Sequence, residues 1–295
     1  MPVYCMALHM KLRSRILFAV MVSIWGTNWS VMKMGLAKAP PLSFISYRFL
    51  FTLTFLLAAY AVSKPKIPRD AKVLEAALVY SLVSTLSLAS TTLGLQSESS
   101  GVGAVLTYTQ PIMVFILAVT FLHEPFSALR LLGIILGFTG VAVLFFEDVT
   151  STLSWGAVLL LLGALLWAVS TIYYKLRLQD SDVALVNLIH AAVTASTIST
   201  VSFLAEPPFQ AWDPGYIAVL AYAGIGASGI GMTIWLILLR DGEATSLSSA
   251  CLIVPPIALL TGSFLMRESL TLRTLLGSTL IIAGIYLVNR KKKAV

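Results

Sequence analysis

The stretch Gly224-Ile225-Gly226-Ala227-Ser228-Gly229 has the most recognisable chemical spacing in this sequence. It fits the G-x-G-x-x-G of dinucleotide-binding loops and also the G-x-S-G of intramembrane serine proteases. The first motif needs a strand before the glycines, and apolar runs of helical length flank them instead. The second needs a histidine on a later helix, but no histidine follows His190. We therefore interpret the glycines as sites of close helix contact.

A second group of residues could bind a small molecule without covalent chemistry, because polar and aromatic side chains occur inside apolar runs. The candidate binding residues are Trp25, Asn28, Arg48, Tyr80, Gln110, Trp167, Thr171, His190 and Thr233. A polar group in a membrane helix needs protein or water beside it, since lipid offers no hydrogen bond. Each polar candidate therefore lines a cavity or joins two helices, and the sequence leaves both interpretations open.

Arg48 is the candidate with the largest cost of burial, because an ionisable group within a membrane span usually faces a cavity or a partner. Arg48 can snorkel to the surface, pair with Glu98 in a nearby loop, or bind an anionic ligand. His190, which is neutral at little cost, is expected to be a packing donor. Glu124 and Glu268 end apolar runs and are interpreted as structural.

The composition indicates that these residues belong to a membrane protein and not to a soluble domain. The chain is 58% hydrophobic and 11% charged, with a mean hydropathy of +0.91, whereas about a quarter of the residues in a soluble domain are charged. The net charge of +7 does not indicate a nucleic-acid partner, because the basic residues are spread between apolar runs. Cys5 and Cys251 are too few for a disulfide framework or a metal cluster, and Cys251 is interpreted as a packing residue.

A helix needs about 20 apolar residues to cross a bilayer, and this length predicts ten spans. They are residues 14–33, 43–63, 73–95, 101–122, 129–146, 154–174, 183–204, 214–239, 245–266 and 272–289. With the N-terminus inside, 15 lysines and arginines lie in inner segments and four in outer ones. The positive-inside rule then places both termini in the cytoplasm.

An internal repeat divides the chain into residues 14–146 and 154–289. Pro111 corresponds to Pro255 and Gly133 to Gly277 at an offset of 144, while Trp25 corresponds to Trp167 at an offset of 142. Each half contains five predicted helices, an odd number, so the two halves must cross the membrane in opposite directions. The predicted fold is an all-α membrane protein of ten helices in two inverted five-helix repeats, a construction typical of secondary transporters.

Two five-helix repeats, a tryptophan within the first helix, and a proline and a closing glutamate in the fourth resemble the EamA-type members of the drug/metabolite transporter superfamily. The resemblance covers nearly the whole chain, although its motifs are diffuse. It implies an exporter or exchanger of amino acids or other small metabolites. His190 stands where the first half has Arg48, so a symmetric charged pair is not implied.

We therefore expect a transporter in the cell inner (plasma) membrane that exports or exchanges a small organic metabolite by alternating access. An intramembrane enzyme of the serine-protease type, a channel and a lipid flippase with the same fold are the alternatives. The expected partners are a small-molecule substrate and the lipid bilayer, without nucleic acid, metal or cofactor, and a homodimer is left open. Facilitated or exchange transport is favoured over proton-driven pumping, because no acidic residue is buried in mid-span.

Overall fold

The computed structural model describes residues 12–63, 70–98, 100–144, 154–207, 212–258, 260 and 272–290. The regular elements of these residues are all helices. Glu268 and both chain termini, which were given roles above, lie outside the described residues.

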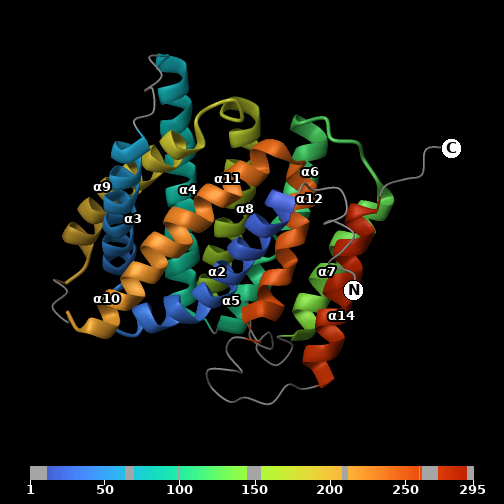
Figure 1. Cartoon of the computed structure of the whole chain (residues 1–295). Coiled ribbons are helices and arrows are strands. Elements are labelled where there is room, and N and C mark those ends of the chain that lie inside the picture. The colour runs from blue at the N-terminus through green and yellow to red at the C-terminus, as the bar shows by residue number, and fades with distance from the viewer. Residues whose placement is uncertain are drawn as a thin grey trace.

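The helices pack together in one bundle (Figure 1). Those of the first half are α2 (Leu12–Leu36), α3 (Pro41–Ser63), α4 (Ala71–Ser97), α5 (Ser100–Thr107), α6 (Gln110–Phe121) and α7 (Ala128–Leu144). Those of the second half are α8 (Trp155–Arg177), α9 (Val183–Ala205), α10 (Pro214–Ala221), the π-helix η1 (Tyr222–Gly231), α11 (Met232–Asp241), α12 (Ala244–Ala250), the 3₁₀ turn η2 (Cys251–Ile253) and α14 (Leu272–Asn289).

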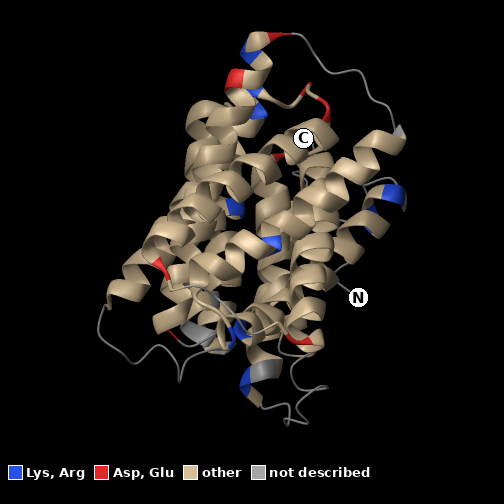
Figure 2. Ribbon diagram, turned by 90° about the vertical axis from the view of Figure 1, so that its left-hand side faces the viewer, with Lys and Arg blue, Asp and Glu red and all other residues tan. Residues whose placement is uncertain are grey.

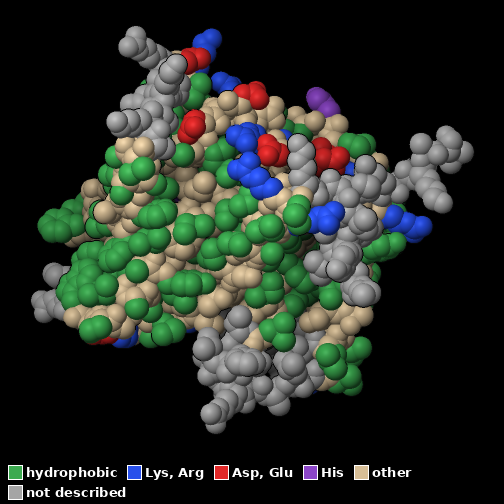
Figure 3. Space-filling view, in the orientation of Figure 1, with side chains coloured by type: hydrophobic (Ala, Val, Ile, Leu, Met, Phe, Trp, Pro, Cys, Tyr) green, Lys and Arg blue, Asp and Glu red, His purple; other side chains and the backbone are tan. Residues whose placement is uncertain are grey.

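Length and composition make this a membrane protein with several spans. Among the described residues, six helices are long and apolar enough to cross a bilayer, the last of them combining α10, η1 and α11. Four shorter apolar stretches accompany them: Val105–Phe121, Ala128–Val143, Ala244–Ala258 and Leu275–Asn289. Hydrophobic side chains are abundant across the middle of the face shown in Figure 3, and most of the charged residues gather toward the two ends of the bundle (Figure 2).

Four of the helices begin at a side chain that caps them, which explains where the chain turns back into the bundle. The carboxylates of Asp70, Asp182 and Asp213 accept hydrogen bonds from the backbone at the start of α4, α9 and α10. The Ser154 hydroxyl does the same for α8. Each bond satisfies one of the backbone N–H groups that a helix leaves without a partner in its first turn.

The most extensive helix contacts in the bundle join one helix from each half. The closest partners are α4 with α8, α3 with α9, and α7 with α14. The last pair lies side by side at one edge of the molecule (Figure 1). There, a Cβ added at Gly133 would lie 2.7 Å from the carbonyl oxygen of Gly284, and one added at Gly140 would lie 2.6 Å from that of Gly277. Glycine is required at these positions because the two backbones approach so closely, as small residues permit in membrane helices.

Candidate substrate cavity

The first interruption of regular helix lies at Pro111. Helix α5 ends at Thr107, a turn follows at Tyr108 and Thr109, and α6 begins at Gln110. Proline has no N–H to donate and fits the first turn of a new helix, which explains why the chain restarts here. The Gln110 amide donates to Ser248 Oγ on α12 at 3.4 Å, so it links the two interrupted segments of the chain.

The second interruption lies at the repeat-related position. Helix α12 ends at Ala250 and tightens into the 3₁₀ turn at Cys251–Ile253, just before Pro255 and Pro256. Both proline-containing segments therefore depart from α-helical geometry within the bundle. In a membrane, irregular backbone is tolerated where it is enclosed by protein or lines a cavity.

The third irregular segment is the π-helix η1, which contains the glycine-rich stretch. Its altered hydrogen-bond register is accompanied by partners from neighbouring helices. Asn187 on α9, which is fully buried, donates through Nδ2 to the carbonyls of Ser228 and Gly229 at 3.3 and 3.1 Å and to Thr233 Oγ1 at 2.9 Å. Thr52 on α3 donates to the Gly224 carbonyl at 2.9 Å. These side chains hold the π-helix in place.

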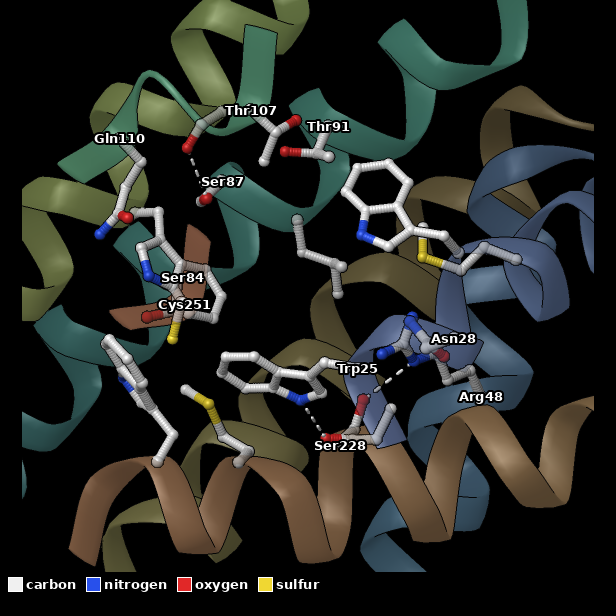
Figure 4. A pocket seen from close by; sticks show the side chains of 18 of the residues that line it. Trp25, Asn28, Arg48, Ser84, Ser87, Thr91, Thr107, Gln110, Ser228 and Cys251 are labelled. Carbon is white, nitrogen blue, oxygen red and sulfur yellow. Dashed lines mark hydrogen bonds between the residues drawn. The ribbon is translucent and has the colours of Figure 1, made fainter. Parts of the chain in front are cut away.

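All three irregular segments meet at one cavity of about 190 Å³. The first interruption contributes Thr107, Tyr108 and Gln110 to its wall, the second Cys251, and the π-helix Ala227 and Ser228. Ser84, Ser87 and Thr91 add a polar edge from α4. Residues from both halves of the chain thus line this one cavity (Figure 4).

One side of the cavity is a wall of tryptophans. Trp25 and Trp167, which occupy matching positions in the two halves, have ring centroids 5.8 Å apart in an edge-to-face arrangement. Trp235 completes the cluster at 5.6 Å from Trp25 and 5.8 Å from Trp167. The indole of Trp25 also donates to the Ala227 carbonyl at 3.3 Å, which ties it to the π-helix. Such a wall offers flat apolar surface and fixed geometry.

The other notable wall residue is Arg48, whose side chain points into the cavity beside Asn28 (Figure 4). It is 6% exposed, its Nε donates to Ser228 Oγ at 2.9 Å, and its Nη1 has no hydrogen-bond partner. The guanidinium also lies over the ring of Phe49, 6.0 Å from its centroid. The pairing with Glu98 left open by the sequence is absent, since that carboxylate instead accepts a hydrogen bond from Ser154. Ser228 therefore contacts a guanidinium, whereas an activated serine would contact a base.

The structure brings six of the nine sequence-predicted site residues to the cavity wall, namely Trp25, Asn28, Arg48, Gln110, Trp167 and His190. The other three lie behind it. Tyr80 packs against Tyr174, with ring centroids 5.8 Å apart. Thr171 donates to the Trp167 carbonyl at 2.8 Å, and Thr233 donates to the Gly229 carbonyl at 2.7 Å.

Sequence reasoning did not single out several other wall residues as binding residues. The sequence pattern assigns the glycines around Ser228 to helix contact and Cys251 to packing, whereas in the structure Ser228 and Cys251 line the cavity. Trp235 has no matching tryptophan in the first half, so the repeat does not mark it as a candidate. Its aromatic side chain was the only feature of the sequence that could have indicated a binding residue. No group of three or more His, Cys, Asp or Glu that could hold a metal ion occurs in the part of the chain that the structure describes.

Comparisons with known proteins agree with this architecture. The EamA-like transporter family matches residues 13–146 and again residues 154–290. The uncharacterized transporter YvbV of Bacillus subtilis is 31% identical over 96% of this chain and 94% of its own length. YoaV of the same organism is 27% identical over 90% and 92% of the two chains. The uncharacterized inner membrane transporter YedA of Escherichia coli is 28% identical over 94% and 90%.

A solved crystal structure of a protein shares the fold at a TM-score of 0.81, with 16% identity over 94% of this chain and 96% of its own. The two matched stretches contain nearly all residues of the described helices and all of the residues that line the cavity. On this evidence the chain belongs to the EamA-like transporter family.

Proposed function

We propose that the protein is a carrier that exports or exchanges a small organic metabolite, an amino acid or a related compound, by alternating access. The observation that carries the proposal is the convergence of three irregular helical segments on one cavity between the halves. Discontinuous helices around a mid-membrane site are the usual construction of secondary transporters. They give the site backbone polar groups and allow one half to move against the other.

The carrier has ten membrane helices in two inverted repeats, 14–146 and 154–289, with both termini cytoplasmic. The contacts of α7 with α14 support this arrangement. Gly133 lies against Gly284, and Gly140 lies against Gly277. Because Gly277 is the repeat counterpart of Gly133 and Gly284 that of Gly140, at an offset of 144 residues, the two contacts are equivalent under exchange of the two halves. The excess of lysine and arginine in the segments assigned to the inside supports the orientation.

Two lysines at matching positions, 142 residues apart, support the repeat as well. Lys33 Nζ donates to the carbonyls of Leu95 and Glu98 at 2.9 and 2.8 Å. Lys175 Nζ donates to those of Arg240 and Gly242 at 3.3 and 3.1 Å. In each half, a lysine near the end of the first helix thus donates hydrogen bonds to backbone carbonyls at the C-terminal end of the third helix.

Uptake into proteoliposomes tests the function. Purified protein should give saturable uptake of at least one class among amino acids, sugars, phosphorylated metabolites and small organic acids. Uptake should accelerate when the same compound is present on the opposite side. A carrier that binds this compound returns loaded, so the return of the empty carrier is avoided. A channel would show no such acceleration. A flippase would move labelled phospholipid while leaving the soluble panel outside, and that result would contradict the proposal.

A further inference from the structure

The cavity has an uncompensated positive charge. Its described wall includes the Arg48 guanidinium but no aspartate or glutamate. The ion pairs found among the described residues involve Lys38, Arg130 and Arg240, all outside the cavity wall. A buried cation with a hydroxyl as its main partner is costly, and an anion brought by a ligand would offset that cost.

The number of charges limits the kind of anion. A phosphate monoester carries close to two negative charges at neutral pH, and the described wall has one arginine and no lysine to meet them. A carboxylate carries one charge and matches the planar fork of a guanidinium. A singly charged carboxylate therefore suits this cavity better than a phosphate.

The other residues of the wall limit the size and polarity of the rest of the ligand. Trp25, Trp29, Trp167, Trp235 and Tyr108 all line the cavity and present flat apolar surface. A cavity of roughly 150 Å³ holds a benzene molecule, and this one measures about 190 Å³. The space therefore fits one aromatic ring with a short acidic arm.

We propose that the cavity selects a small carboxylic acid with one ring-sized apolar body, whose carboxylate is held by Arg48 and whose ring lies against the tryptophan wall. This inference rests on the proposed transport function and narrows it. Among amino acids and related compounds, it favours the acid without an ammonium group. Asn28 Oδ1, which has no partner, is the acceptor that an ammonium could use, but the ammonium would then lie near the positive Arg48.

A series of ligands that share a phenyl ring but differ in their polar group tests the inference in the intact, purified protein. Binding is measured by isothermal titration calorimetry at neutral pH for 3-phenylpropanoate, its neutral amide, 3-phenylpropylamine, phenylalanine and phenyl phosphate. The carboxylate should bind at least tenfold more tightly than the amide, a difference of about 1.4 kcal/mol. Phenylalanine, phenyl phosphate and the amine should each bind more weakly than the carboxylate.

Variants then assign the preference to one side chain. Arg48→Gln should abolish the advantage of the carboxylate over the amide, and Arg48→Lys should keep part of it, because lysine retains the charge but not the fork. Arg240→Gln, at an exposed arginine paired with Asp241, is the matched control and should leave the preference unchanged. Because the ligand series is also informative on the unaltered protein, the test survives a variant that fails to fold.

Equal binding of carboxylate and amide, tighter binding of phenylalanine or phenyl phosphate, or no binding of the carboxylate would each overturn the inference. Parallel uptake measurements separate this outcome from failure of the proposed function. Transport of a neutral or zwitterionic compound without a carboxylate preference would remove the inference alone. Absence of carrier-mediated uptake for every soluble compound would remove the transport function itself.

Discussion

Replacing Trp25 with alanine should lower transport at least tenfold while the protein still accumulates in the membrane. The indole forms the centre of the aromatic wall, in contact with Trp167 and Trp235, and it orients the wall through its bond to the Ala227 carbonyl. Losing a substrate contact of about 1.4 kcal/mol accounts for the tenfold change. The measurement compares initial uptake rates, divided by the amount of protein, in proteoliposomes.

Two further variants make this result specific. Trp25→Phe keeps a ring but loses the indole N–H, so it should retain more transport than alanine. Trp155→Ala removes a tryptophan that is 76% exposed at the start of α8 and should behave like the unaltered protein. If the alanine variant fails to accumulate while Trp155→Ala accumulates normally, Trp25 maintains the fold and is not primarily a binding residue.

Replacing Asn187 with leucine should cause the largest loss of stability among single changes near the cavity. Its amide nitrogen donates to the carbonyls of Ser228 and Gly229 in the π-helix and to the hydroxyl of Thr233 in α11. Leucine would leave these acceptors without the donor in a buried, apolar setting. Since a hydrogen bond between membrane helices contributes up to about 1.7 kcal/mol, we expect a total cost of roughly 2–3 kcal/mol.

Thermal unfolding in detergent, followed by circular dichroism, measures this effect. The control is Asn289→Leu, because the Asn289 amide donates to the Ile285 carbonyl one turn earlier on its own helix. The control should unfold near the temperature of the unaltered protein, whereas Asn187→Leu should unfold several degrees lower. Equal melting temperatures for the two variants would mean that the π-helix does not depend on Asn187.

The sequence indicated the helical membrane character and the proline positions because these depend on local composition and on the repeat. Trp25 and Trp167 could be paired by their offset alone, and the structure places their rings in contact. The π-helix could not be predicted in the same way. The glycine-rich stretch from Gly224 to Gly231 indicates close packing, but the hydrogen-bond register of a helix depends on its neighbours, here Asn187 and Thr52.

The three candidates that lie behind the cavity wall show a second limit. Helical spacing indicates that Tyr80 shares a face with Ser84 and Ser87, yet it does not indicate what that face contacts along its length. In the structure the serines line the cavity, whereas Tyr80, one turn earlier, packs against Tyr174. Likewise, one helix carries Trp167 at the wall and Thr171 behind it, where the threonine hydroxyl donates to the Trp167 carbonyl.

The central claim is that one cavity opens to the two sides of the membrane in turn, and Cys251 in the cavity wall allows a direct measurement. In a Cys5→Ser background, a small membrane-impermeant thiol reagent is applied to right-side-out and to inside-out vesicles. An added cysteine at the exposed Asp180, on the segment assigned to the cytoplasm, serves as a one-sided control. The account predicts that Cys251 reacts from both sides, while the control reacts from the cytoplasmic side alone. Reaction of Cys251 from one side only, with the control behaving as expected, would contradict alternating access to this cavity.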